Sequence, residues 1–474
     1  MKNISYRGSI MLLVIVFGGV FFTLLVSLSG FVLVQSHAQD IARQRGAAFS
    51  IAESGLEYYR WFLSHFPGDP TNGTGMAGPF VRSYDDPEGG VAGTNTLTIL
   101  GNGACGVPQS IDVVSAGTPS DAPQVSVTLS ARYALPSVAA YSYIVGSSVW
   151  AGADRIINGP YHSNGGIRMD GTTNAPVSSS LSTWNCTSSF GCSPSQPSAP
   201  GVVGSGPNQN LWSYPTPQVD FGAISANFTS LKSIAETNGL YFDRFSNGKN
   251  TNNSYYKGYH LVFNADGTLT VYKVSNETKQ TVTPVNPNSG SNDYTLINNE
   301  NLYGTYTIPA DCGLIFIEDH AWIEGTITRK VTVVAADVSN SGVVPYVVLK
   351  NNILYSTYDG TAGLTVISAG DILIAPDAPV NMTLNGIFIA QSGAFGRNLY
   401  ACPGSYEPRG TLTILGTTVS NLRTGTKWMN GCGSGSNAGY QTRIDAFDRQ
   451  NSTNPPPFTP TTSSQWEFVD WQQK

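Results

Sequence analysis

The first 66 residues of the chain constrain its structure more than any other part. No charged side chain occurs between Ser9 and Gln35. This stretch is longer than the roughly 20 apolar residues that a helix needs to cross a hydrocarbon core about 30 Å thick. Two basic residues precede it, and the first acidic residue, Asp40, follows it. The positive-inside rule therefore predicts a cytoplasmic stub over residues 1–8, a membrane helix over residues 9–35 and an extracytoplasmic body.

A cleavable secretory signal is the alternative to a retained membrane helix. Small residues of the kind that signal peptidase prefers occur at Ser36-His37-Ala38. However, the apolar core of a signal peptide spans about 7–15 residues, and this one is much longer. We therefore interpret the segment as a single-pass helix that buries in lipid or in a bundle of helices. The residues that we assign to this membrane or assembly contact are Leu13, Phe17, Phe21, Leu25 and Phe31.

The helical pattern continues beyond the membrane segment through residues 36–66. Apolar residues recur there at intervals of three, four and seven, which is the spacing of one helix face. They are Ile41, Ala48, Ala52, Leu56, Tyr59 and Leu63. Pro67 and Gly68 then end the pattern. The sequence predicts one continuous helix whose second half packs this stripe against a sheet.

The composition indicates an exported β protein of two or three domains. Of 474 residues, 12% are charged, and glycine (51) and proline (28) are abundant, which is typical of short strands joined by many turns. The net charge of −6 and the pI near 5.4 provide no basic surface for nucleic acid. Nucleic-acid binding is therefore excluded from the candidate functions.

The body shows two strand patterns in succession. Residues 67–145 contain apolar runs at 96–100, 110–114 and 124–129, which predict an antiparallel meander. Residues 146–200 and 311–450 contain short aliphatic groups separated by Gly, Asn and Asp, which favours a β-helix or solenoid whose rungs stack on one another. An antiparallel sandwich is the alternative. The predicted fold is mainly β with a long N-terminal α-helix.

Residues 201–310 are predicted to form an α+β insertion between the two parts of the solenoid. Asp220 is the expected N-cap of one amphipathic helix, which ends at Asn238-Gly239. A hairpin follows, with its turn at Asp266-Gly267. Residues 451–474 form a Pro- and Thr-rich strap with two tryptophans, which we expect to dock on the body.

All six cysteines lie beyond the membrane segment, in a compartment that permits disulfides. The hypothesised pairs are Cys186 with Cys192, Cys402 with Cys432 and, as the remaining pair, Cys105 with Cys312. Neither the cysteines nor the five histidines have the spacing of a zinc site. We therefore predict no metal and no cofactor.

The N-terminal region resembles the class III-signal proteins of type IV pilus systems, and minor pilins of the PilX type in particular. The resemblance lies in Arg7-Gly8 before the apolar run and in the segment Ala47–Glu57, with the letters AAFSIAESGLE. It implies cleavage after Gly8 by a membrane aspartyl peptidase, which leaves Ser9 as the new N-terminus. It also implies partners among other pilin-like subunits, the pilus assembly machinery and the membrane. The chain departs from major pilins at Leu13, where they carry Glu.

The expected function is that of a structural subunit or assembly factor of a type IV pilus-like system, located in the cell membrane or in a pilus at the cell surface. The exported body would serve surface contact or adhesion, with carbohydrate as a candidate partner. The alternative is a membrane-tethered carbohydrate-active enzyme on a parallel β-helix, because such folds host enzymes that use paired carboxylates.

The best candidates for catalysis are Glu318-Asp319-His320 with Glu324, followed by His162 near Asp170. Adjacent residues on a strand point to opposite faces, so Glu318 and Asp319 are not expected to share a site. The acidic turn Asp85-Asp86-Pro87-Glu88 lacks the spaced oxygen ligands of a calcium loop. We therefore predict that the protein is not an enzyme.

Overall fold

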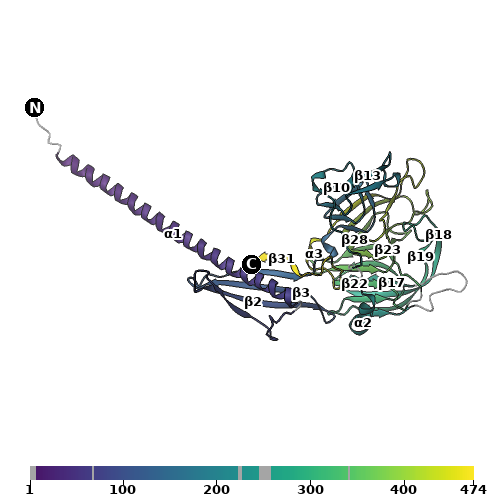
Figure 1. Cartoon of the computed structure of the whole chain (residues 1–474), viewed down its shortest axis with the longest axis horizontal. Helices are drawn as coiled ribbons and strands as arrows, with labels where there is room; N and C mark the ends of the chain where they lie inside the picture. Colours follow the sequence, from purple (N-terminus) through teal and green to yellow (C-terminus); the bar gives the residue numbers. More distant parts are fainter. Residues whose placement is uncertain (1–6, 67–68, 223–226, 245–257, 340–341) are drawn as a thin grey trace, which may run out of the picture. The chain divides into compact units, whose positions relative to one another are not determined.

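The computed structural model describes residues 7–66, 69–222, 227–244, 258–339 and 342–474 (Figure 1). As predicted, the fold is mainly β, with 45% strand and 18% helix. The chain forms two compact units. The first comprises Met1–Gly101, Ile111–Tyr133 and Asp470–Lys474, and the second comprises Asn102–Ser110 and Ala134–Val469.

The first unit is organised around one long helix, α1 (Arg7–His65). Its second half carries the predicted stripe, and five of the six residues are buried: Ala48, Ala52, Leu56, Tyr59 and Leu63. The exception is Ile41, which is 39% exposed. Its spacing fits the stripe, but burial begins only with the turn that contains Ala48, so Ile41 is not part of the packed face.

A five-stranded sheet accompanies this helix, in the order β1-β2-β3-β4-β31. Its strands are β1 (Phe80–Asp85), β2 (Val91–Ala104), β3 (Val107–Pro119), β4 (Val127–Ala134) and β31 (Glu467–Gln473). β1 and β2 pair antiparallel, as the meander predicts. β31 lies in the predicted C-terminal strap, whose sequence did not indicate a strand.

Small residues let the helix approach the sheet closely. A Cβ atom added to Gly117 in β3 would lie 2.2 Å from the Ala48 carbonyl oxygen and 2.3 Å from the Ala52 nitrogen. A Cβ on Gly55 of the helix would lie 2.4 Å from Ser115 Oγ. Alanine and glycine on the facing surfaces of α1 and β3 thus set the distance between the helix backbone and the strand backbone. Larger side chains do not fit between them.

The second unit consists mostly of parallel strands stacked in ladders. One ladder runs, strand by strand, β16-β20-β22-β24-β26-β28-β5-β8-β11-β15, and every pairing in it is parallel. Its strands are β16 (Leu240–Phe242), β20 (Leu314–Ile317), β22 (Lys330–Ala335), β24 (Gly363–Ser368), β26 (Met382–Ala390), β28 (Arg409–Ser420), β5 (Tyr143–Val145), β8 (Tyr161–Ser163), β11 (Val177–Ser179) and β15 (Trp212–Ser213).

Three further parallel ladders complete the rungs. The second is β17-β21-β23-β25-β27, the third is β23-β26-β28-β30-β7-β10, and the fourth is β6-β9-β14. Their additional strands are β17 (Gly258–Phe263), β21 (His320–Ile327), β23 (Val347–Tyr355), β25 (Ile372–Ile374), β27 (Phe395–Gly396), β30 (Ala438–Ala446), β7 (Arg155–Asn158), β10 (Thr172–Thr173), β6 (Val149–Ala151), β9 (Ile167–Met169) and β14 (Val202–Val203). The arrangement is that of a solenoid, not an antiparallel sandwich.

From β20 to β26 the first ladder is buried on both of its faces. Alternate residues of its strands, such as Ile315 and Val333, belong to the main core cluster. The residues between them, such as Phe316 and Val334, belong to a second cluster. Members of that second cluster outside the ladder come from α2 (Phe228–Asn238), from η1 (Val138–Ala140) and from Cys105 of the β2–β3 turn. Strands buried on both sides explain the continuous aliphatic runs in the sequence.

The segment 201–310 joins the solenoid through four of its strands. β14 and β15 pair parallel with β9 and β11, and β16 and β17 pair parallel with β20 and β21. The predicted insertion therefore contributes strands to the ladders at both of its ends. The predicted hairpin is confirmed: β17 pairs antiparallel with β18 (Thr268–Thr281), and Gly267 has a φ of 87° in the turn. β18 continues antiparallel into β19 (Asn292–Thr307).

The predicted N-cap of the helix in this segment is wrong. α2 begins at Phe228, and its cap is Asn227, whose side chain accepts a hydrogen bond from the Ser230 N–H at 3.1 Å. The Asp220 carboxylate instead accepts from the Gly222 N–H at 2.7 Å in a local turn. Asp and Asn form both local turns and caps, and sequence spacing alone does not distinguish the two.

The six cysteines form three disulfides, in the pairs hypothesised from the sequence: Cys105–Cys312, Cys186–Cys192 and Cys402–Cys432. The Cys186–Cys192 loop contains η2 (Ser188–Phe190), which follows β12 (Thr183–Cys186) and precedes β13 (Gln196–Pro200). The remaining elements are η3 (Gln209–Leu211), β29 (Lys427–Trp428) and α3 (Arg449–Thr453).

The C-terminal strap docks on the second unit over residues 451–461. Its Pro457 carbonyl oxygen accepts from Thr332 Oγ1, and its Thr459 hydroxyl lies 2.7 Å from the Thr365 hydroxyl. Lys330 Nζ donates to the Asn454 carbonyl oxygen at 2.6 Å. Hydrogen bonds therefore satisfy the threonines that β22 and β24 place among aliphatic neighbours.

Candidate functional site: the exposed apolar half of α1

The N-terminal half of α1 exposes an uninterrupted apolar surface. The predicted membrane-facing residues are all exposed in the first unit: Leu13 (55%), Phe17 (66%), Phe21 (64%), Leu25 (46%) and Phe31 (65%). The most apolar window of the helix has a mean hydropathy of 2.7, and none of it is buried. By length and composition this helix could therefore cross a membrane.

The polar groups of this half are compatible with a lipid environment. The backbone of α1 satisfies its own N–H and C=O groups, which is the requirement for crossing a bilayer. Thr23 Oγ1 donates to the Val20 carbonyl oxygen at 2.8 Å, so this hydroxyl is satisfied within the helix as well. An apolar surface of this size on a folded protein indicates contact with lipid or with other apolar surfaces.

The predicted processing residues lie at the start of this helix. Gly8 and Ser9 belong to the first turn of α1, which begins at Arg7. Leu13 follows within the next turn and is one of the exposed apolar residues. Cleavage after Gly8 stays a prediction from the resemblance.

The second half of α1 fixes the helix to its own unit. Tyr133 Oη donates to the Leu56 carbonyl oxygen at 2.5 Å, and Asn95 Nδ2 donates to Ser54 Oγ at 3.3 Å. Burial, together with the nearby charge of Glu57, raises the pKa of Tyr133 well above its ordinary value, so the phenol stays protonated and keeps donating. The exposed half is therefore presented by a firmly anchored helix.

Of the candidate catalytic residues, Glu318 and Asp319 lie between β20 and β21, and His320 is the first residue of β21. Glu318 is buried and accepts from Lys232 Nζ at 2.9 Å and from Tyr241 Oη at 2.5 Å. The Asp319 carboxylate accepts from the His320 N–H at 2.9 Å. The two carboxylates thus have separate partners, as expected for adjacent residues.

His320 is unsuited to gain a proton. Burial and the nearby Arg244 lower its pKa to about 3, so the imidazole is neutral at ordinary pH. Its Nδ1 accepts from the Tyr346 N–H at 3.0 Å, and the two rings stack at 3.7 Å. The ring therefore serves the packing between β21 and the strand that follows Tyr346.

Glu324 belongs to a cluster that the sequence analysis missed. His260 on β17 contacts Glu324 through Nε2 at 2.9 Å and Glu300 on β19 through Nδ1 at 2.8 Å. Glu300 and Glu324 lie 40 and 64 positions after His260 in the sequence, so no local motif indicates the cluster. Only the pairing of β17 with β21 and the return of β19 bring them together.

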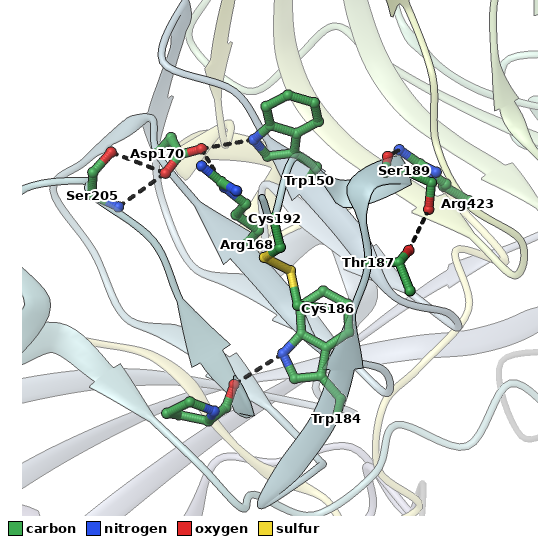
Figure 2. Close-up of a disulfide and its surroundings, with 11 residues drawn as sticks. Trp150, Arg168, Asp170, Trp184, Cys186, Thr187, Ser189, Cys192, Ser205 and Arg423 are labelled. Atoms are coloured by element: carbon green, nitrogen blue, oxygen red, sulfur yellow. Dashed lines mark hydrogen bonds and ion pairs between the residues drawn. A yellow bond between two sulfur atoms is a disulfide. The ribbon is translucent and has the colours of Figure 1, made fainter. Parts of the chain in front are cut away.

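The weaker candidates for catalysis, His162 and Asp170, have separate hydrogen-bond partners in the structure. His162 lies 2.9 Å from Ser178 Oγ and 3.0 Å from Asn164 Oδ1. Asp170 accepts from Trp150 Nε1 at 2.8 Å, from Arg168 Nε at 2.7 Å and from the backbone and hydroxyl of Ser205 (Figure 2). Burial raises the pKa of Asp170, but these donors outweigh it and hold the pKa below its ordinary value.

The disulfide loop next to Asp170 is a firmly connected surface feature. Cys186 and Cys192 are buried, and Trp184 Nε1 donates to the Pro200 carbonyl oxygen at 2.9 Å (Figure 2). Arg423 donates to the Ser189 carbonyl oxygen at 2.8 Å from the far side of the loop. All of these groups have structural partners.

The remaining acidic turn lies at the surface of the first unit. Asp86 Oδ1 accepts from the Glu88 N–H at 2.9 Å, which makes the segment a local turn. Among the described residues, no group of three or more His, Cys, Asp or Glu side chains is placed to hold a metal ion.

No family model and no curated protein matches the chain. Among solved structures, the chain is similar to the competence-associated pilin ComZ from Thermus thermophilus. The sequence identity is 13%, and the match covers 91% of this chain and 97% of that chain. The TM-score is 0.29, which is too low for the likeness to carry an argument about this protein.

Proposed function

We propose that the protein is a pilin-like structural subunit or assembly factor of a type IV pilus-like system. The observation that carries the proposal is the division of α1 into an exposed apolar half and a half that is buried on a sheet. A helix of this kind can hold the body at a membrane and can also pack with other helices of its kind. The resemblance of the segments around Arg7-Gly8 and Ala47–Glu57 to PilX-type minor pilins supports the same assignment.

The role is assembly and display, without catalysis. Glu318 and His320, the strongest candidates for chemistry, are buried and have structural partners. The partners are the membrane, other pilin-like subunits and the assembly machinery, and the body serves surface contact, with carbohydrate as the candidate ligand. The orientation places the N-terminus in the cytoplasm, because the charges that flank the apolar segment follow the positive-inside rule.

Substitution in the exposed half of α1 tests the proposal. Phe21→Lys places a charge near the middle of the apolar segment, which costs about 2.5–3.5 kcal/mol for membrane insertion. We expect the variant to leave the membrane and sheared-filament fractions of the cell, as measured by immunoblotting of each fraction. The matched control is Leu302→Lys, since Leu302 is 64% exposed on β19 and should tolerate the same change.

Two results would contradict the proposal. The first is a wild-type chain that is found in the soluble exported fraction only. The second is an unchanged distribution of Phe21→Lys between membranes and filaments. Sequencing the N-terminus of the membrane form tests the processing step separately, and a start at any residue other than Ser9 refutes cleavage after Gly8.

A further inference from the structure

His260 lies between two carboxylates that belong to different parts of the second unit. It is 3% exposed on β17, which pairs on one side with β18 and on the other with β21. Its Nδ1 is 2.8 Å from Glu300 Oε2 on β19, and its Nε2 is 2.9 Å from Glu324 Oε1 on β21. One imidazole thus bridges the β18–β19 hairpin and the parallel ladder.

The geometry requires a charged ring. An ionised carboxylate only accepts hydrogen bonds, and a neutral imidazole has one N–H to donate. Both contacts of His260 are hydrogen bonds only when both ring nitrogens carry protons. The protonated ring then makes two charge-assisted bonds, which are about twice as strong as neutral ones. Loss of one proton leaves a ring nitrogen lone pair facing a carboxylate oxygen, so one contact becomes repulsive.

Among the described residues, the other groups around the His260 ring do not donate a hydrogen bond to it or accept one from it. On β18, the Tyr272 ring stacks on His260 with centroids 5.7 Å apart. On β23, Asn351 donates to Glu324, and Lys350 acts on Glu324 by its charge while it binds Asp377 at 3.0 Å. Within the part of the chain that the structure describes, the two side chains within hydrogen-bond distance of the His260 ring are both carboxylates.

We propose that His260 is an acid-strengthened clamp, which ties β19 to β21 while its ring is protonated and loosens this tie when the ring loses a proton. Leu302 and Tyr303 of β19 are 64% and 48% exposed, so the clamp controls how firmly the unit presents them.

The direction in which the strength of the clamp changes with pH follows from the pKa shifts of His260 and Glu324. Burial lowers the pKa of His260, but the bonds and charges of Glu300 and Glu324 outweigh it and raise the pKa above the ordinary value. The clamp is thus fully formed below about pH 6.5 and is lost as the pH rises through the raised pKa. The bond to His260 lowers the pKa of Glu324 below its ordinary value of 4.5, so the Glu324 carboxylate stays ionised throughout the range in which the ring titrates.

Hydrogen exchange of the full-length protein in detergent tests the clamp. Exchange in peptides from β19 is measured at about pH 6 and about pH 9, on either side of the expected titration of the histidine. Exchange in peptides from β22 at the same two pH values corrects for the intrinsic effect of pH on the exchange rate. In the wild-type protein we expect the protection of β19 relative to β22 to fall about tenfold at the higher pH, because one charge-assisted bond is lost. In His260→Gln we expect low protection of β19 at both pH values.

Two further variants make the test decisive. His37→Gln, at an exposed position of α1, should behave as the wild-type protein does. Glu300→Gln removes one of the two charges, and the Gln amide can accept from a protonated ring nitrogen or donate to an unprotonated one. We therefore expect the protection of β19 to depend less on pH in this variant than in the wild-type protein, even if His260→Gln folds poorly. The clamp is refuted if the wild-type protection of β19 relative to β22 does not change with pH. It is refuted equally if the protection of β19 falls as much with pH in Glu300→Gln as in the wild-type protein.

Discussion

The two halves of α1 share one backbone but differ in the size and the environment of their side chains. From Leu13 to Phe31 the helix exposes large residues such as Phe17 and Phe21. From Ala48 to Leu63 the buried face begins with alanines, next to the glycines of the sheet. Large exposed residues suit contact with lipid or neighbouring helices, whereas small ones allow close contact with a sheet whose position is fixed. The comparison shows that burial, together with the small residues at the closest contacts, distinguishes an exposed half of the helix from a packing half.

The largest expected effect on stability comes from replacing one leucine in the packing half, compared with one leucine in the exposed half. Leu56 is 1% exposed, and Leu56→Ala should lower the free energy of unfolding of the first unit by about 2–5 kcal/mol, since it leaves a cavity. Leu25 is 46% exposed, so Leu25→Ala should leave that free energy nearly unchanged. Denaturant unfolding in detergent, followed by tyrosine and tryptophan fluorescence, measures both. Equal effects of the two substitutions would contradict the division.

A smaller effect is expected from adding one methyl group. A Cβ on Gly117 would lie 2.2 Å from the Ala48 carbonyl oxygen, so Gly117→Ala must push the helix away from β3. We expect a loss of about 1–3 kcal/mol in the free energy of unfolding, as in other overpacked contacts. Gly18→Ala is the control, because a Cβ at Gly18 meets nothing within 4 Å. A stability that Gly117→Ala leaves unchanged would show that the close approach is not required.

The sequence indicated the elements that depend on local pattern. The charge-free run, the stripe and the short aliphatic groups predicted α1, the meander and the stacked strands, because hydrophobic periodicity acts over a few residues. The pattern failed at the ends of elements, where Ile41 continues the spacing but lies outside the packed face. It failed again at Asp220, whose side chain forms a local turn in place of a cap.

Features made by distant segments were not predictable. β31 comes from the C-terminal strap and joins the sheet of β1–β4, and its sequence suggested only a docking tail. The site around His260 needs Glu300 and Glu324, which lie on two other strands. Such contacts depend on strand register, and one residue of slip would turn each side chain to the opposite face.

The smallest expected loss of stability comes from removing a single hydroxyl in the packing half. Ser54 Oγ accepts from Asn95 Nδ2 at 3.3 Å, and Asn95 is 4% exposed. Ser54→Ala removes this acceptor and leaves a buried amide without that partner, so we expect the free energy of unfolding to fall by about 1 kcal/mol. Ser64→Ala is the matched control, because Ser64 is exposed and its hydroxyl donates to the Trp61 carbonyl oxygen within the helix. If both serines tolerate the change equally, the contact between Ser54 and Asn95 adds nothing to the anchoring of α1, which then depends on the packing of its buried face and on the bond from Tyr133 to Leu56.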